Sequence, residues 1–327
     1  MAIPGQDVAA LQIIVQGSAF CQASWGDISQ EEYKEIIKVS AGEGYRILRD
    51  GGSAVDAVEA AVRVLEDNEY FNAGYGSTLN NDGEVECNAM IMDGSSLNTD
   101  SFCGLIEAVI SGRYFRNPVS LAKKIMNDTQ YCALSGEGAL NYAIEQGFPT
   151  CGPNQLITQR QRNSQIRYLG FNDYIPLGLP VTPTDTVSAV ARDANGRLAC
   201  AVSTGGIAGS LKGRVSDAAM VGCGGYANEH GAATTSGQGE YLMKMTLARE
   251  VVYMMESGMN AQEAAENALR KMQNKFQQSG LGGVIAIDKD GNVGKACTTD
   301  YMGWASVNGD RMANGLNPQM EVRTLSL

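Results

Sequence analysis

One histidine among 327 residues is the scarcity with the largest consequence for this chain. A Ser-His-Asp triad or a metal site with several histidines would depend on His230 alone. That residue lies in the polar run 227–231, which predicts a surface loop rather than a reactive centre. If the chain catalyses a reaction, its general base must therefore be another group.

Positive charge and long apolar runs are also scarce. The chain has 25 Lys and Arg against 36 Asp and Glu, a formal net charge of −11, which argues against nucleic acid and anionic membranes as partners. No apolar run approaches the roughly 20 residues of a membrane-spanning helix. Residues 1–17 lack the basic start and long apolar stretch of a signal peptide. We therefore expect a cytoplasmic protein with no membrane partner.

The eight cysteines show no CxxC spacing. This pattern indicates neither a zinc site nor a disulfide framework. We expect buried thiols at Cys21, Cys87, Cys103, Cys132, Cys151, Cys200, Cys223 and Cys297.

Hydrophobic residues make up 44% of the chain, enough for a large core. Their spacing and the turn residues between them predict strands at 10–19, 84–92, 103–111, 283–287, 293–298 and 302–307. The same analysis predicts helices at 31–49, 53–65, 118–126, 136–146, 240–257 and 261–276. The stretch 152–184 has no periodicity and predicts a linker. Such an alternation predicts a layered α/β sandwich with antiparallel sheets.

The stretch 185–206 is the centre of this pattern. Two strands at 187–192 and 198–203 are joined by a turn whose Asn and Gly tolerate positive φ. Thr186 stands where the first strand begins, and Thr204 where the second ends. Antiparallel pairing would bring the two hydroxyls together at one edge of a sheet, although threonine is common in strands for packing reasons alone.

Motifs before and after this hairpin give it a context. Asp-Thr-Val at 185–187, Ser-Thr-Gly-Gly at 203–206, Gly-Arg-Val-Ser-Asp at 213–217 and Thr-Thr-Ser-Gly-Gln-Gly-Glu at 234–240 follow in order, with further matches at 51–58 and 71–74. Each motif alone is weak, but the ordered set resembles the plant-type asparaginase and isoaspartyl aminopeptidase family of N-terminal-nucleophile hydrolases. The resemblance covers roughly residues 35–310. It implies one domain, 1–327, with a four-layer αββα sandwich.

The resemblance implies that the chain cuts itself between Asp185 and Thr186. Segment 1–185, with a linker at about 152–185, would become the α subunit, and 186–327 would become the β subunit. The αβ units of this family pair into homodimers. Thr186 would be the nucleophile, and its freed amino group, with an ordinary pKa of about 7.7–8.0, would be the general base.

The resemblance also implies how substrate is held. Thr204 would lie beside the nucleophile and orient its amine. Arg214 and Asp217 would bind the substrate's α-carboxylate and α-amino groups, because a guanidinium can grip a carboxylate through two hydrogen bonds. Taken by itself, the Arg214–Asp217 spacing is equally typical of a surface ion pair.

Further residues take roles from the same resemblance. The Ser236 hydroxyl and the Gly237 backbone N–H would form the oxyanion hole, Gly239 would leave room for substrate, and Asn72 would lie next to the site. No cofactor is required. A structural sodium ion would be held by the backbone carbonyls of Leu65, Glu66, Asn68, Phe71, Ala73 and Tyr75.

The chain differs from the usual family residues at several positions around the nucleophile. They are Gln16-Gly17-Ser18 in place of His-Gly-Gly, Asp185 and Ser188 in place of Gly, Ser236 in place of Thr, and Gln238 in place of His. Ser236 keeps the hydroxyl but loses the methyl that fixes the rotamer. The motifs that belong to the fold are nearly untouched.

Two functions of different classes remain open at this point. The first is an autoprocessing threonine amidohydrolase that acts on L-asparagine and β-aspartyl (isoaspartyl) dipeptides. The second is an uncleaved, inactive or very slow relative with a structural or interaction role. Glycosylasparagine hydrolysis is favoured only by Asp185-Thr186. A phosphate site in the glycine-rich runs at 205–213 and 222–225 is disfavoured, because no GxxxxGK[ST] is present.

Overall fold

The computed structural model describes residues 11–20, 28–95, 106–171, 186–277, 280–317 and 320–324. The larger of its two sheets contains β1 (Gln12–Phe20), β2 (Cys87–Asp93), β3 (Ile106–Gly112), β4 (Ala133–Ser135), β5 (Val187–Arg192), β6 (Leu198–Thr204), β11 (Tyr301–Asn308), β12 (Arg311–Asn317) and β13 (Met320–Thr324). Their spatial order is β13-β12-β11-β1-β5-β6-β2-β3-β4. The hairpin of β5 and β6 therefore lies in the middle of this sheet.

The smaller sheet contains β7 (Gly225–Asn228), β8 (Gly231–Gly237), β9 (Gly282–Asp288) and β10 (Val293–Cys297), in the order β10-β9-β8-β7. The α-helices are α1 (Gln30–Arg49), α2 (Ala54–Glu66), α3 (Pro118–Asp128), α4 (Gly136–Glu145), α5 (Gln159–Phe171), α6 (Gly239–Met245), α7 (Leu247–Glu256) and α8 (Ala261–Phe276). The predicted mixed α/β class is confirmed.

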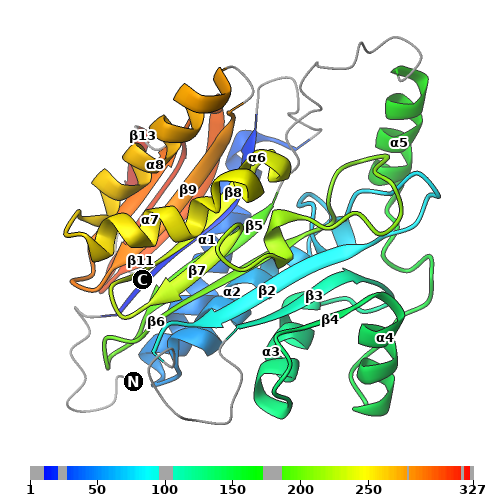
Figure 1. Cartoon of the computed structure of the whole chain (residues 1–327), viewed down its shortest axis with the longest axis horizontal. Coiled ribbons are helices and arrows are strands. Elements are labelled where there is room, and N and C mark those ends of the chain that lie inside the picture. Colours follow the sequence, from blue (N-terminus) through cyan, green and yellow to red (C-terminus); the bar gives the residue numbers. More distant parts are fainter. Residues whose placement is uncertain are drawn as a thin grey trace.

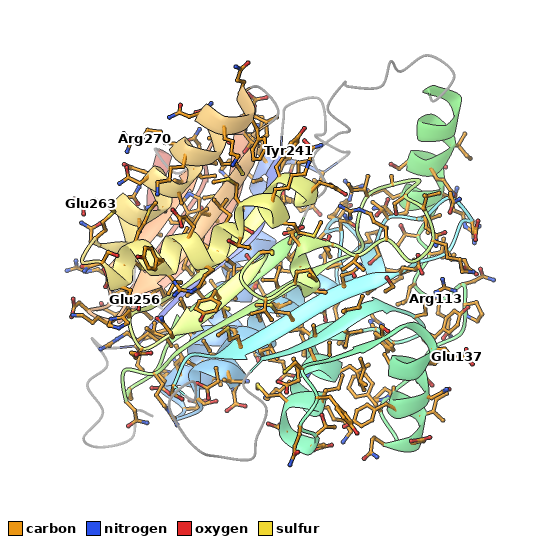
Figure 2. All side chains as sticks on the ribbon, viewed as in Figure 1. Arg113, Glu137, Tyr241, Glu256, Glu263 and Arg270 are labelled. Atoms are coloured by element: carbon orange, nitrogen blue, oxygen red, sulfur yellow. The ribbon has the colours of Figure 1, made fainter. Side chains whose placement is uncertain are left out.

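Helices cover the outer faces of both sheets. α1, α2 and α3 pack on the larger sheet, and α7 and α8 pack on the smaller one (Figure 1). The inner faces meet where β1, β5 and β6 contact β7, β8 and β9. Large apolar side chains fill this interface, among them Ile14, Met90, Val190, Ile285 and Trp304. The outer faces of α7 and α8 are polar, and Glu256, Glu263 and Arg270 point away from the sheet (Figure 2).

Local sequence signals fix several helix ends. Ser53 and Asp56 form a capping box at the start of α2, and Asn260 and Glu263 form another at the start of α8. Gly51 has φ +89°, the left-handed conformation that ends α1. Each of these helix ends therefore rests on residues within one turn of it.

The prediction of no regular structure over 152–184 is wrong for its middle part, where α5 runs over 159–171. α5 is polar, so apolar periodicity could not reveal it. Its side chains attach it to distant backbone: Gln161 Nε2 donates to the Gly76 carbonyl (2.8 Å) and Gln165 Nε2 to the Asn80 carbonyl (2.9 Å). The remainder of the expected linker, 172–185, lies outside the described residues.

Two other elements differ from their predictions. The single helix expected at 240–257 is divided into α6 and α7 by Thr246, which has φ +46°. Tertiary contacts cause the break, because the Ala248 and Arg249 amides donate to the Cys223 and Gly222 carbonyls. The strand expected to be last, 302–307, is followed by β12 and β13.

The single histidine lies where the sequence predicts, but the cysteines do so only in part. His230 lies in the turn between β7 and β8, as predicted. Cys87, Cys200 and Cys223 are buried thiols, but Cys132 is exposed, and Cys151 and Cys297 are half-buried, so burial was over-predicted. Cys21 and Cys103 lie outside the described residues. Over the part of the chain that the structure describes, no helix combines the length and apolar character needed to cross a membrane.

Candidate active site

The central hairpin brings the two predicted threonines together at its open end, where β5 begins and β6 ends. β5 and β6 pair antiparallel from Arg192↔Leu198 to Val187↔Ser203. Continuing this register by one pair places Thr186 opposite Thr204. Both side chains are buried, and directly opposed residues in such a pair have Cα atoms about 4.5–5.5 Å apart. Asp185, the other half of the expected cleavage site, lies outside the described residues.

The chain leaving Thr204 is held in a tight turn. Thr204 Oγ1 accepts from the Gly206 amide (3.2 Å). Asn72 Nδ2 donates to the Gly206 carbonyl (2.8 Å), and Asn72 Oδ1 accepts from the Thr78 amide (2.8 Å). Thr78 Oγ1 in turn donates to the Gly205 carbonyl (3.0 Å). Asn72 therefore fixes the backbone beside Thr204, a contact that sequence reasoning did not anticipate.

Arg214, Asp217 and Gly239 come together from two separate segments. A Cβ added to Gly239 would lie 2.6 Å from Asp217 Oδ1 and 3.0 Å from Arg214 Nη2. Glycine is therefore the residue that leaves space against both charged groups. A Cβ added to Gly206 would lie 3.6 Å from Arg214 Nη1, so this cluster adjoins the turn after Thr204.

Asp217 is a buried carboxyl with unused hydrogen-bonding capacity. Its Oδ1 accepts from Ser216 Oγ (3.0 Å), while among the described residues Oδ2 has no partner. Burial raises the pKa of Asp217 to about 6, against the opposing effects of the Ser216 hydroxyl and the Arg214 charge. A buried carboxylate oxygen without a donor is costly, and a bound ammonium group would satisfy it.

Ser236 and Gly237 end β8 on the side that leads into this cluster. Ser236 Oγ accepts from the Ala19 amide (3.2 Å), which leaves its own hydroxyl hydrogen available to another acceptor. Gly237 has φ +144°, and a Cβ there would lie 2.5 Å from the Leu281 carbonyl oxygen. This position therefore requires glycine.

Two positions that differ from the usual family residues lie between the sheets. Gln16 is fully buried and faces Gly283, and neither amide atom of Gln16 has a partner in the described part of the chain. Ser188 Oγ accepts from Thr234 Oγ1 at 2.8 Å. The substituted residues thus form a polar patch on the same face of β1 and β5 as Thr186.

Two glycines in the loop after α2, Gly74 and Gly76, lie close against backbone carbonyl oxygens. A Cβ added to Gly76 would lie 2.0 Å from the Phe71 oxygen and 2.9 Å from the Asn68 oxygen, and one at Gly74 would lie 2.5 Å from the Glu66 oxygen. Carbonyl oxygens suit hard cations. Within the described residues no cluster of three His, Cys, Asp or Glu side chains could hold a metal, so a cation here would rest on backbone oxygens.

Glu240 is a site residue that the sequence analysis missed. Arg214 Nε and Nη2 both donate to Glu240 Oε1, at 3.0 and 2.8 Å. The residue lies in the first turn of α6, at the end of the 234–240 motif, so the motif itself was the available signal. Its carboxylate holds the guanidinium beside Gly239 and Asp217.

Comparison with known proteins shows the family of the chain. A family model described as asparaginase matches residues 9–316. A rat protein named isoaspartyl peptidase/L-asparaginase is 41% identical over 309 residues, which cover 94% of this chain and 89% of the relative. A human protein of the same name is 40% identical over 301 residues, covering 90% and 93%. A Pyrococcus furiosus protein named plant-type L-asparaginase is 37% identical over 308 residues, covering 90% and 95%.

The chain therefore belongs to the asparaginase family. The resemblance inferred from the ordered motifs is confirmed.

Proposed function

We propose that this protein is a threonine amidohydrolase that cleaves the side-chain amide of L-asparagine and the isoaspartyl bond of β-aspartyl dipeptides. The observation that carries the proposal is the cluster of Arg214, Asp217 and Gly239. A guanidinium and a buried carboxyl with a free oxygen, both packed against a residue that must lack a side chain, suit the carboxylate and ammonium groups of one α-amino acid. The names of the rat and human relatives support the same substrates.

The reaction would begin at Thr186. Its hydroxyl adds to the substrate's side-chain carbonyl carbon, and its free α-amino group takes the proton. The oxyanion receives hydrogen bonds from the Ser236 hydroxyl and the Gly237 amide. The C–N bond then breaks, the amino group returns the proton to the departing nitrogen, and an aspartyl ester of Thr186 remains. Water, deprotonated by the same amino group, hydrolyses the ester and releases aspartate.

The mechanism requires a free amino group on Thr186, so the chain must first be cut after Asp185. In the uncut chain the Thr186 hydroxyl would add to the Asp185 carbonyl carbon, and the Asp185–Thr186 C–N bond would break as its nitrogen takes the hydroxyl proton. Water would then hydrolyse the resulting ester, which frees the Asp185 carboxylate and the amino and hydroxyl groups of Thr186. Thr204, opposite Thr186, would orient the hydroxyl and later the amine. The family membership and the burial of both threonines at one sheet edge support this step.

The larger organisation follows from the same family. We propose that the two facing sheets and their outer helices form the αββα sandwich of the N-terminal-nucleophile type in one domain, 1–327, which is cut into 1–185 and 186–327. The αβ units would pair as homodimers. A sodium ion would stabilise the loop that carries Asn72, held by the backbone oxygens of Leu65, Glu66, Asn68, Phe71, Ala73 and Tyr75. Catalysis would need no cofactor, and we expect no nucleic-acid partner.

Hydrolysis assays test the function directly. Purified protein should release ammonia from L-asparagine and free leucine from β-aspartyl-leucine. Thr186→Ala should abolish both reactions, because it removes the hydroxyl. Release of both products by Thr186→Ala at the rate of the unmodified protein would refute Thr186 as the nucleophile.

A further inference from the structure

The segment that carries Arg214 is attached to the hairpin formed by residues 79–85. Leu79 and Val85 bridge across this hairpin, just before β2. The Gly209 amide donates to the Leu79 carbonyl (2.8 Å), and the Asn81 amide donates to the Ser210 carbonyl (2.8 Å). The connection from Thr204 to Arg214 is therefore held along the hairpin rather than free in solvent.

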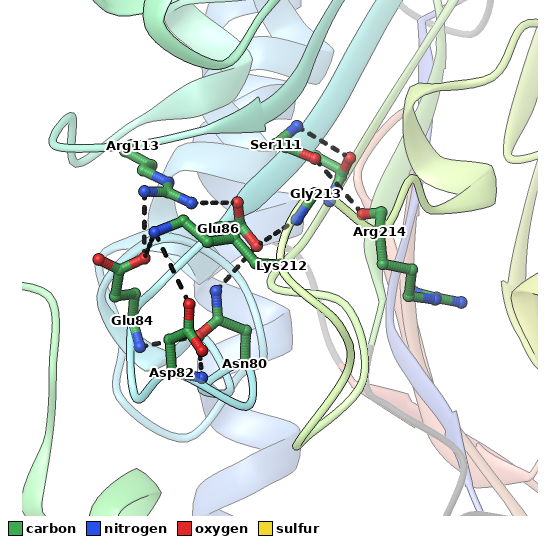
Figure 3. A network of polar contacts seen from close by, with 10 residues as sticks. Asn80, Asp82, Glu84, Glu86, Ser111, Arg113, Lys212, Gly213 and Arg214 are labelled. Atoms are coloured by element: carbon green, nitrogen blue, oxygen red, sulfur yellow. Dashed lines mark hydrogen bonds and ion pairs between the residues drawn. The ribbon is translucent and has the colours of Figure 1, made fainter.

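Glu86 is the buried centre of this attachment. Cys87 pairs with Gly112 in the β2–β3 register, so the next residues outward, Glu86 and Arg113, are neighbours. Arg113 Nη2 lies 2.5 Å from Glu86 Oε1. Asn80 Nδ2 and the Gly213 amide both donate to Glu86 Oε2 at 2.9 Å. One carboxylate thus joins β3, the hairpin and the Arg214 segment (Figure 3).

The charge of Glu86 is maintained by these contacts. Burial disfavours the ionised carboxylate, but the donors Arg113, Asn80 and Gly213 outweigh burial and lower its pKa. Lys212 pairs with Glu84 and Asp82 on the outer side of the network, where side chains are 35–49% exposed. Those outer pairs are screened by solvent and contribute little to stability. Glu86 is therefore the charged side chain that holds the segment at Gly213, beside the backbone bonds at Gly209 and Ser210.

Gly213 connects Glu86 to the backbone of Arg214. The Arg214 amide donates to the Leu211 carbonyl (3.0 Å), which closes a turn with Gly213 at φ +82°. Ser111 Oγ donates to the Arg214 carbonyl (3.4 Å). The Arg214 side chain leaves the network and extends away from it (Figure 3), toward Glu240 and Gly239. Glu86 thus fixes the base of the side chain, and Glu240 fixes its end.

We propose that Glu86 is a positioning residue that sets the affinity of Arg214 for the α-carboxylate of the substrate, with Arg113 and Asn80 as its supports. This rests on the proposed function. A two-bond contact between guanidinium and carboxylate depends on orientation. Without its charge, residue 86 loses the ion pair with Arg113 and keeps one acceptor oxygen for the three donors Arg113, Asn80 and the Gly213 amide, so the turn at Gly213 is held less firmly. Glu86 touches neither the substrate nor Thr186, so it acts on binding rather than on the chemical step.

The test compares Glu86→Gln with the unmodified protein. Calorimetric titration with L-aspartate should give a Kd about tenfold weaker for the variant. In assays with L-asparagine, KM should rise about tenfold while kcat stays within about twofold. This pattern is expected when a substitution weakens binding of the substrate and of the transition state equally. Arg113→Met, which removes the main support of Glu86, should shift Kd and KM in the same direction and serves if Glu86→Gln fails to fold.

The matched control is Glu59→Gln. Glu59 is a half-buried carboxylate that, like Glu86, accepts from a cation, here Lys123 (2.6 Å), and from a second donor, the Ser120 hydroxyl (2.6 Å), but it lies between α2 and α3. Its Kd and KM should match those of the unmodified protein. Three results would each overturn the proposal: an unchanged Kd in Glu86→Gln, a kcat that falls by as large a factor as KM rises, or no L-aspartate binding by the unmodified protein. Binding of L-aspartate without hydrolysis of L-asparagine would refute the proposed function instead, and the Kd comparison would then decide whether Glu86 positions Arg214.

Discussion

Asp217 is the residue whose ionisation, under the proposed function, would link stability to substrate binding. Burial raises its pKa from 3.8 to about 6, so the fold favours the protonated carboxyl. That contribution to stability is fully present below about pH 3.8 and is lost as the pH rises through about 6. In the proposed function substrate has the opposite preference, because its ammonium group would pair with the ionised carboxylate.

We therefore expect Asp217→Asn to flatten the pH dependence of stability. Between about pH 4 and about pH 7.5 the unmodified protein should lose up to about 3 kcal/mol relative to the variant, at about 1.4 kcal/mol per pKa unit. Urea unfolding at both pH values measures this, with the exposed Asp290→Asn as control. If the free energy of unfolding depended on pH in the same way in Asp217→Asn and in the unmodified protein, burial would not raise the pKa of Asp217. The variant should also bind L-aspartate far more weakly.

The Ser188–Thr234 contact gives a second prediction for single residues. Their hydroxyls form a buried 2.8 Å hydrogen bond between the sheets. Thr234→Val and Ser188→Ala should each lower the free energy of unfolding by about 1–2 kcal/mol, while the double variant should lose less than the sum, because no buried hydroxyl is left without a partner. A double-mutant cycle by urea unfolding measures the coupling, and strict additivity would contradict the contact.

Among the elements, α8 offers the cleanest test of a local sequence signal. Its capping box closes both ways between Asn260 and Glu263. Asn260→Ala should lower the free energy of unfolding by about 1 kcal/mol. Asn274→Ala makes the same substitution at an exposed position in the last turn of α8 and should stay within about 0.5 kcal/mol. Equal effects of the two variants in urea unfolding would argue that the cap contributes nothing.

Elements specified by neighbouring residues were predictable from sequence, and those specified by distant contacts were not. The β5–β6 hairpin, the capped helices α2 and α8, and the glycine that ends α1 each carry their signal within a few residues. α5 depends on amides that reach Gly76 and Asn80, and the break at Thr246 depends on the 222–223 loop. Neither of these long-range contacts produces a periodic pattern of apolar residues in the sequence.

The same distinction holds for the candidate site. Motif order gave Thr186, Thr204, Arg214 and Asp217, because those residues stand inside contiguous motifs. It gave no role to Glu86, whose partners come from sheet register and from a turn more than a hundred residues later in the chain. Long-range register is a property of the folded sheets, and no local pattern encodes it.

For the whole molecule, the central claim is that one chain becomes two and that the cut creates the catalytic amine. The proposed function makes the roles of Thr186, Thr204 and the Arg214–Asp217 cluster depend on that cut. Gln16 and Ser188 share the sheet face that carries Thr186, and Ser236 contacts β1 from β8, so we expect these substituted residues to affect the rate of cleavage first.

The most direct measurement is the intact mass of freshly purified protein under denaturing conditions, repeated after prolonged incubation. The account predicts two fragments that meet between Asp185 and Thr186, and a Thr186→Ala variant that stays whole. A single, folded chain that never splits would contradict the amino-base mechanism and would favour an uncleaved relative with a structural role.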